Sequence, residues 1–314
     1  MDRYLRHRLI MAAAVVVLLL AACGEDADDE PTGMSSPSPE ATESAEPDSS
    51  PSPTPDRTEQ PDPADDAPDD AVTGGGQASV WFARQSEAGI WLEPETLPLD
   101  PGTERVLRAV VEAVVDGQSA HPALTSLVPA GTEVLDVRIE DRVAVIDLSG
   151  DIASAGGSSA QESALAQQLA QTATQFETVD ALRLLVDGQP VDELWGHLDW
   201  SQPLTADPAA VAPIIIEQPT WGAVRPPGPV TASGSSVTFE STVELRLVAP
   251  DGTVAEGTFT TAAQPDVGRR GPWSHTFDTE ATTPGTWTIE AIEPDASDGE
   301  GRPPYTTSVE FTVG

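Results

Sequence analysis

The fold of the first half of the chain is decided by residues 134–149, which read VLDVRIEDRVAVIDLS. At the start of this stretch Leu135, Val137 and Ile139 alternate with charged residues, and the run from Val143 to Leu148 is mainly apolar. Alternation with a period of two is typical of a strand with one buried face, and a short apolar run is typical of a buried strand. The two parts together predict a β-hairpin.

A helix is predicted before this hairpin. Asp100 and Pro101 have the pattern of an N-cap and a first helical residue, Glu104 falls in the first turn, and Asp116-Gly117 ends the helix. Its apolar stripe consists of Val106, Leu107, Val110, Val111, Val114 and Val115.

A second helix is predicted after the hairpin, with two alternative starts. Either Ser158 with Gln161 or Ser159 with Glu162 has the spacing of a capping box. The apolar side chains of this helix are those of Leu165, Leu169 and Phe176. Two further strands are predicted, one from Val80 to Phe82 and one that contains Leu182, Leu184 and Val186 and ends in a turn at residues 187–190.

The predicted fold class is α+β, in two domains. The repeated helix-plus-hairpin pattern predicts a duplicated α/β domain over residues 77–207, with its helices on one face of a sheet. Residues 208–314 have no helical period, and about seven short apolar strands with turns between them predict an all-β sandwich of immunoglobulin type. Its clearest signals are the strands 214–216, 243–248, 287–289 and 308–313 and the hairpin turn Asp251-Gly252.

Several of these stretches resemble a known family. The run 143–149, the second helix, the segment 184–190 and the segment Trp195-Gly196-His197-Leu198-Asp199 are similar to the GerMN domain of sporulation and spore germination proteins. Residues 214–219, 237–243 and 250–252 resemble the immunoglobulin-like domain found beside GerMN in bacterial spore germination proteins. The resemblance implies a non-catalytic protein and supplies no catalytic or ligand residue, and a sporulation role does not follow from it.

The N-terminus predicts export and a lipid anchor. A basic segment precedes an apolar run from Leu9 to Ala22, which is too short to cross a membrane comfortably and is typical of a signal peptide, residues 1–22. The run ends in a lipobox, Leu20-Ala21-Ala22, followed by the only cysteine, Cys23. We therefore expect an acylated Cys23 on the extracytoplasmic face of the cell membrane, with an uncleaved short anchor as the alternative.

Residues 23–76 complete the predicted N-terminal part as a lipidated cysteine and an acidic tether. Residues 24–76 contain sixteen acidic side chains and one base, Arg57, with many Pro and Ser residues, a composition that predicts disorder. It is also compatible with O-glycosylation. The whole chain has 52 acidic residues, 15 basic residues and a formal charge of -37, which disfavours nucleic acid as a partner.

The sequence predicts no enzyme, no cofactor and no metal. The four histidines lie far apart, and an acid–base pair of His197 and Asp199 is less expected than two surface side chains. The acidic loop 295–300 could bind calcium, although its spacing is not that of an EF-hand. Trp195 and Trp221 are the candidate glycan-binding residues, because aromatic rings outside strands can stack on sugars.

The sequence therefore predicts a non-catalytic cell-envelope lipoprotein. It would act as a scaffold or adaptor that binds an unknown envelope protein or assembles with copies of itself, and sheet edges of the α/β domain could mediate this assembly by strand pairing. The alternative from another class is a wall module that binds peptidoglycan through Trp195 and Trp221.

Overall fold

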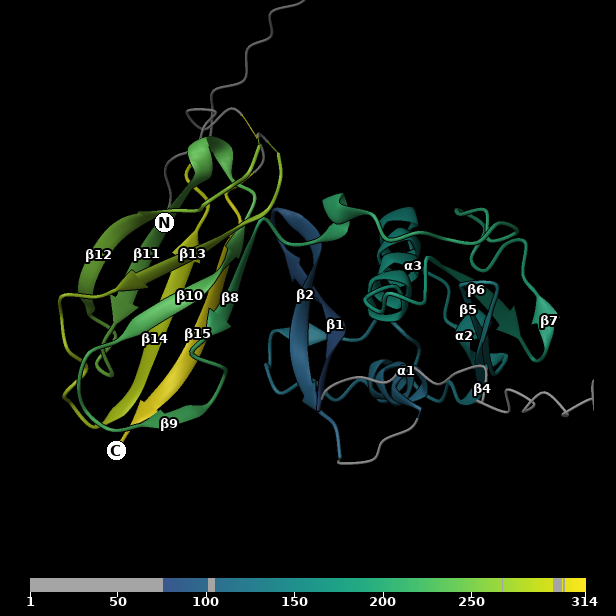
Figure 1. Cartoon of the computed structure of the whole chain (residues 1–314), viewed down its shortest axis with the longest axis horizontal. Coiled ribbons are helices and arrows are strands. Elements are labelled where there is room, and N and C mark those ends of the chain that lie inside the picture. The colour runs from purple at the N-terminus through teal and green to yellow at the C-terminus, as the bar shows by residue number, and fades with distance from the viewer. Residues whose placement is uncertain (1–75, 101–104, 267, 296–300, 302) are drawn as a thin grey trace, which may run out of the picture. The chain divides into compact units, whose positions relative to one another are not determined.

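The computed structural model describes residues 76–100, 105–266, 268–295, 301 and 303–314 (Figure 1). They belong to one compact unit, residues 63–314. The predicted signal peptide, lipobox, Cys23 and tether, the helix start at Pro101 and Glu104, and most of the acidic loop 295–300 lie outside the described residues and stay predictions.

The strands of the first domain form two small sheets (Figure 1). One has the order β2-β1-β3, with β1 (Gln77–Ser86), β2 (Gly89–Pro98) and β3 (Leu124–Thr125). The other has the order β4-β5-β6-β7, with β4 (Val134–Glu140), β5 (Val143–Leu148), β6 (Ala181–Val186) and β7 (Gln189–Pro190). Strands β5 and β6 are parallel, and the other pairs are antiparallel.

The two long helices, α1 (Val106–Asp116) and α3 (Ser159–Ala173), lie between these two sheets (Figure 1). The short helix α2 spans Asp151–Ser154. Helix α1 contacts β1 and β4, and α3 contacts β1, β2 and β6, so both long helices bury side chains against two layers (Figure 1). The order hairpin, helix, strand occurs twice, in agreement with the predicted α+β class. The expectation of a single sheet with helices on one face was wrong, since β1 pairs with β2 and β3 in a sheet of its own.

Helix α1 is described from Val106 and ends where expected. Arg105 precedes its first residue, Val106, and makes no side-chain capping bond. Gly117 takes the left-handed conformation, with φ 66°, which ends the helix as a glycine readily can. The predicted stripe is buried from Val106 to Val114, whereas Val115 is half-buried.

Helix α3 begins with the first of the two predicted capping boxes. The Ser158 side chain accepts from the Gln161 N–H, and the Gln161 side chain accepts from the Ser158 N–H at 3.0 Å. Leu165 and Leu169 are buried as expected. Phe176 lies beyond the end of the helix, so its assignment to the helix was wrong.

The hairpin of β4 and β5 is confirmed, but its alternation is incomplete. Val137 is buried, Ile139 is half-buried and Leu135 is 44 % exposed. The register shifts between Val134 and Asp136, so Leu135 is the extra residue of a β-bulge and leaves the buried face.

The second domain is a β-sandwich, as predicted. One sheet has the order β13-β10-β8 and the other β12-β11-β14-β15-β9. Within the described residues its eight strands are β8 (Ile214–Gln218), β9 (Ala223–Arg225), β10 (Thr231–Ser236), β11 (Thr242–Val248), β12 (Val254–Thr261), β13 (Gly271–Thr276), β14 (Gly285–Ile292) and β15 (Thr306–Val313). The turn at Asp251-Gly252 joins β11 to β12, and Trp273 and Trp287 fill the core.

Among the described residues, no helix is long and apolar enough to cross a membrane.

Candidate functional site

The hairpin of β1 and β2 contacts the β-sandwich. Trp81 and Trp91 of this hairpin pack against the sandwich core, and the Trp91 ring meets the ring of the fully buried Tyr305 edge-on, with centroids 6.0 Å apart. The chain between the domains is held by a hydrogen bond of 2.9 Å from the Ala212 N–H to the Leu92 carbonyl. The two domains therefore share an apolar contact, and buried polar groups lie within it.

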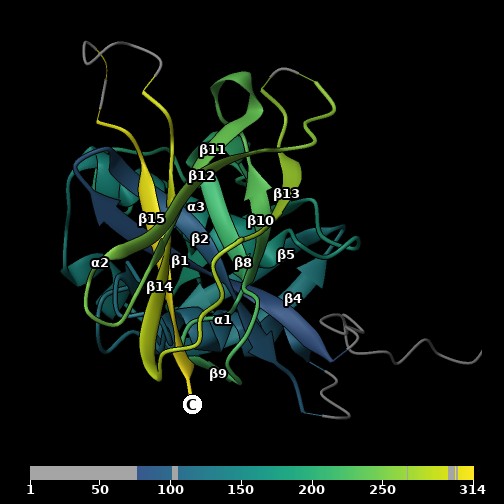
Figure 2. The same cartoon turned by 90° about the vertical axis from the view of Figure 1, so that its left-hand side faces the viewer.

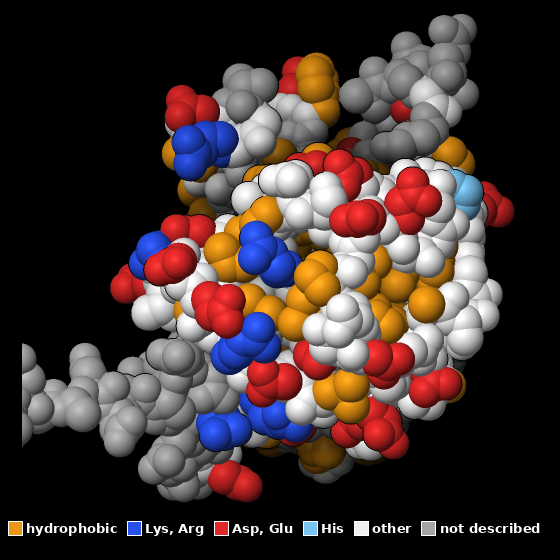
Figure 3. Space-filling model, turned by 90° about the vertical axis from the view of Figure 1, so that its right-hand side faces the viewer, with side chains coloured by type: hydrophobic (Ala, Val, Ile, Leu, Met, Phe, Trp, Pro, Cys, Tyr) orange, Lys and Arg blue, Asp and Glu red, His pale blue; other side chains and the backbone are white. Residues whose placement is uncertain are grey.

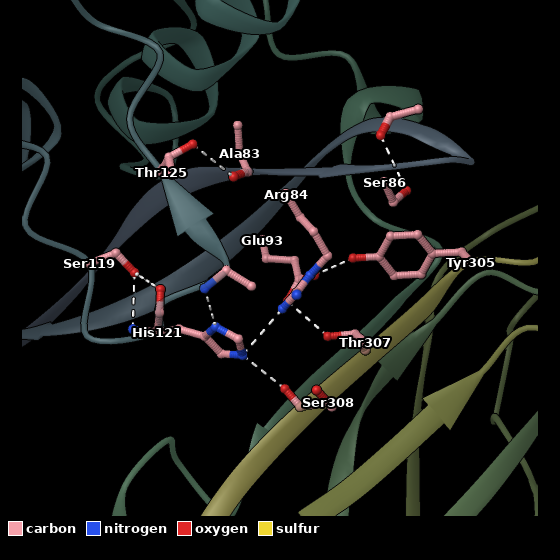
Figure 4. Close-up of polar contacts among 12 residues, drawn as sticks. Ala83, Arg84, Ser86, Glu93, Ser119, His121, Thr125, Tyr305, Thr307 and Ser308 are labelled. Carbon is pink, nitrogen blue, oxygen red and sulfur yellow. Dashed lines mark hydrogen bonds and ion pairs between the residues drawn. The ribbon is translucent and has the colours of Figure 1, made fainter.

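We call these buried groups the junction cluster: Arg84, Glu93, His121, Tyr305 and Thr307 (Figure 4). Glu93 is its centre. The Arg84 guanidinium and the Tyr305 hydroxyl both donate to Glu93 Oε1, and the Thr307 hydroxyl donates to Oε2 at 3.2 Å. One carboxylate thus accepts hydrogen bonds from both domains, because Arg84 comes from β1 while Tyr305 and Thr307 come from the sandwich.

The charges in the junction cluster stabilise each other. Burial works against the charge on Arg84, but the hydrogen bond and negative charge of Glu93 outweigh it and raise the pKa of Arg84. Burial, with the neighbouring Glu93, also raises the pKa of Tyr305, which keeps its hydroxyl protonated as a donor. Arg84 and Glu93 are each less than a tenth exposed, so these groups act in holding the structure.

His121 completes the junction cluster with both ring nitrogens engaged. The Ala123 N–H donates to Nδ1 at 3.1 Å, so this nitrogen carries no proton, and Nε2 lies 2.9 Å from the Ser308 carbonyl of β15 (Figure 4). Nε2 also lies 3.3 Å from the Arg84 guanidinium, so the His121 ring contacts both domains. Its face packs against the Trp221 ring, with centroids 4.1 Å apart.

A groove of about 410 Å³ lies beside the junction cluster and contains one of the two predicted glycan-binding residues. Trp221 lines it and is half-buried, next to His121 and Pro219. On the other side, the Glu95 carboxylate accepts from the backbone N–H groups of Ala120 and His121 at 3.0 and 2.9 Å and so fixes the loop that carries His121.

A second buried carboxylate, Glu162, lies inside the first domain. It is fully buried in the first turn of α3 and accepts from the backbone N–H groups of Trp195 and His197, at 3.0 and 2.9 Å, and from the Trp200 indole at 2.9 Å. Burial alone would raise the pKa of Glu162, but these three donors together lower it. Glu162 therefore anchors the loop that follows β7.

The second predicted glycan-binding residue, Trp195, belongs to this anchored loop. It is half-buried, packs against the core of the first domain and donates from its indole to the Ile152 carbonyl at 3.0 Å. Its ring lies so close to Gly157 that a Cβ there would be 2.7 Å from it. Trp195 and Trp221 lie in different domains, and glycan binding by either one stays a prediction.

The side chains of His197 and Asp199 are exposed and bond to other groups. His197 Nε2 lies 3.2 Å from the Gly157 carbonyl, while Asp199 accepts from the Ser201 N–H and hydroxyl at 2.9 and 2.6 Å. Both residues line a shallow depression of about 480 Å³ with Asp192 and Glu193. The hydrogen bonds therefore give the two side chains separate local roles.

The side of the molecule that carries β7 has a mixed surface. Acidic and basic side chains are interspersed there, with hydrophobic side chains between them (Figure 3). Within the described ranges no group of three or more His, Cys, Asp or Glu side chains could hold a metal ion. Of the acidic loop considered for calcium, only Asp295 is described.

Sequence reasoning missed the junction cluster and the burial of Glu162. Arg84 and Glu93 are isolated charges in strands, and only the folded structure shows that they are buried and form an ion pair between β1 and β2. Tyr305 gives no local signal at all. Glu162 was considered only as a capping residue, and its three donors lie more than thirty residues away in the chain.

Comparison with known proteins identifies both domains. Residues 79–192 match the family model described as sporulation and spore germination, and residues 213–300 match the one described as an immunoglobulin-like domain of bacterial spore germination. No curated protein matches the chain.

Solved structures with similarity to the chain include proteins of two organisms. A candidate lipoprotein from Clostridium perfringens is 28% identical over 43% of this chain and 90% of its own, with a TM-score of 0.32. The first GerMN domain of the sporulation protein GerM from Bacillus subtilis is 24% identical over 41% of this chain and 97% of its own, with a TM-score of 0.35.

The tandem GerMN domains of GerM from Bacillus subtilis are 18% identical, over 58% of each chain, with a TM-score of 0.36. Because all three TM-scores are low, the assignment of this chain depends on the two family models, which cover most of its described residues. The chain therefore carries a domain of the sporulation and spore germination type, followed by an immunoglobulin-like domain of the bacterial spore germination type.

Proposed function

We propose that this protein is a non-catalytic lipoprotein of the cell envelope, held by a lipid on Cys23, that acts as a scaffold through contacts with other proteins. The observation that carries the proposal is the junction cluster. Its ionisable side chains are buried and hydrogen-bonded across the two domains. This arrangement keeps the side chains away from solvent and suits a role in joining the domains.

Two further observations support the scaffold. Neither matched family is described by a reaction, since both are described by sporulation or germination. The second buried carboxylate, Glu162, is likewise engaged by three donors within its own domain. The groups that would usually perform acid–base chemistry therefore hold the structure together.

The lipid anchor is tested by substituting Cys23, the only cysteine that could accept the lipid. The full chain should fractionate with membranes and leave them only in detergent, whereas Cys23→Ser should be released, because two acyl chains on one residue give stable anchoring. Membrane association of Cys23→Ser equal to that of the wild type would reject the lipid anchor.

A wall-binding module is the second candidate function. Trp221 favours it, since this half-buried ring lines an open groove of about 410 Å³. Stacking on a sugar face would use the part of the ring that remains exposed. Trp221→Ala should then reduce binding to peptidoglycan, while Trp287→Phe, a change inside the sandwich core, should leave that binding unchanged.

A further inference from the structure

One edge of the sandwich is formed by a strand that has a bulge at its start and one inward-pointing acid, Glu256, but none of the Pro, Lys or Arg residues that often protect an edge strand. Strand β12 is the last in the sheet order β12-β11-β14-β15-β9, so one side of its backbone has no paired strand in the described structure (Figure 2). It is eight residues long, and its one register shift lies at Ala255. Such an edge is a template for pairing with another strand.

The two faces of β12 differ in a regular way. Thr258 lies opposite the buried Leu245 and faces the interior, where Glu256 and Thr260 also point. Gly257 and Phe259 lie on the outer face, and Phe259 is 62 % exposed. Val254 at the start of the same strand is 55 % exposed, so β12 exposes two large apolar side chains.

The one charged side chain of β12 makes contacts within the sandwich. This acid, Glu256, accepts from the Thr279 N–H at 2.7 Å and lies 3.8 Å from His275 Nε2. Burial alone would raise the pKa of Glu256, but the Thr279 and Asp278 N–H groups, the Thr279 hydroxyl and His275 together lower it. In a chain of formal charge -37, β12 is therefore an edge without free like charges to repel a copy of itself.

The sequence of β12 is complementary to itself in one register. If two copies pair antiparallel about a two-fold axis at Thr258, Thr258 faces its equivalent, Phe259 covers Gly257 of the second copy, and Glu256 faces Thr260. Thr–Thr pairs are favourable across strands, an aromatic ring shields the bare backbone of glycine, and no like charges oppose each other. A two-fold contact of this kind is self-complementary.

We propose that β12 is the interface through which two copies of this chain pair, joining their five-stranded sheets edge to edge. The inference rests on the proposed scaffold function and specifies its partner as a second copy. It differs from the expectation that sheet edges of the α/β domain mediate assembly, since it places the contact on an edge of the sandwich.

The deciding experiment substitutes Gly257. Its backbone is not in the left-handed region and a Cβ there meets no atom within 4 Å, so Gly257→Lys should fold while placing a charge where Phe259 of the second copy would lie. The matched control is Val224→Lys, which adds the same charge to an exposed side chain on β9, the opposite edge of the same sheet.

The self-association of the full chain in detergent is measured over a concentration series by multi-angle light scattering. We expect dimers of the wild type and of Val224→Lys, and dimerisation about ten-fold weaker or more for Gly257→Lys. Thr258→Cys should in addition form a disulfide between copies on oxidation, in a Cys23→Ser background. A strictly monomeric wild type, or equal dimerisation of Gly257→Lys, would overturn the inference.

The scaffold function can be judged separately. If the chain is monomeric but in-cell crosslinking joins it to a distinct envelope protein, the pairing of β12 is wrong and the scaffold stands. If dimers form through β12 and a reaction is found, the pairing stands and the scaffold is wrong.

Discussion

The two buried carboxylates of this molecule are held in different ways. Glu93, between the domains, has a cation, Arg84, and two hydroxyl donors, whereas Glu162, inside the first domain, is held by three N–H groups. In the first arrangement two opposite charges are buried together, and removing one of them costs free energy because the other is left unpaired. In the second arrangement the carboxylate is stabilised by the dipoles of N–H groups alone. The comparison indicates that an ion pair within the first domain holds the carboxylate to which the sandwich hydroxyls donate, while dipoles alone fix a loop.

The largest effect is expected at the charge pair. Glu93→Gln leaves the buried Arg84 guanidinium without its counter-ion, so the free energy of unfolding should fall by about 3 to 5 kcal/mol. Urea denaturation of the Cys23→Ser chain measures it. A loss below about 1 kcal/mol would show that the pair is not buried as described.

A smaller loss is expected at the dipole-held carboxylate. Glu162→Gln keeps the shape of the side chain but removes the charge and turns one acceptor into a donor that faces N–H groups, so about 2 to 3 kcal/mol should be lost. The same urea titration is the measurement. A loss larger than that of Glu93→Gln would reverse the comparison.

The free energy of unfolding at acid pH tests the role of Glu162. Because folding lowers the pKa of Glu162, its stabilising contribution is fully present above the ordinary glutamate value and is lost as pH falls through that value toward the folded one. The difference in unfolding free energy between wild type and Glu162→Gln should be constant above about pH 5 and narrow below about pH 4.3. A difference that widens on acidification would contradict this assignment.

The hydroxyl donors of the junction cluster should contribute less than its charges. Tyr305→Phe removes one hydrogen bond to Glu93 and keeps the ring that packs against Trp91, so about 1 to 2 kcal/mol should be lost. Differential scanning calorimetry checks this as a lower melting temperature. A loss equal to that of Glu93→Gln would mean that the hydroxyl, and not Arg84, holds the carboxylate.

The smallest effect is expected at an exposed pair of the same chemistry. Arg142 and Asp180 form two hydrogen bonds of 2.6 Å, yet both are solvent-exposed, so Asp180→Asn should leave the melting temperature unchanged within error. This variant is the matched control for Glu93→Gln. A clear fall would show that burial is not what makes the junction pair important.

Local sequence patterns predicted much of the fold but neither the junction cluster nor the contacts of Glu162. The stripe of α1, the capping box of α3 and the β4–β5 hairpin follow from spacings within a few residues. Strand β2 escaped prediction because Pro94 and the glutamates around it hide the strand pattern. The contacts of Glu93 with Tyr305 and Thr307 span more than 200 residues, and no local pattern carries such pairings.

The central claim, a scaffold that works through protein contacts, is tested most directly by sedimentation with protein-free peptidoglycan. The Cys23→Ser chain is mixed with the wall material at physiological salt, and the pelleted fraction is measured for it and for its Trp195→Ala and Trp221→Ala variants. The account predicts that the chain stays in the supernatant. A chain that pellets, and that either tryptophan substitution releases without unfolding it, would contradict the scaffold and establish the wall-binding module.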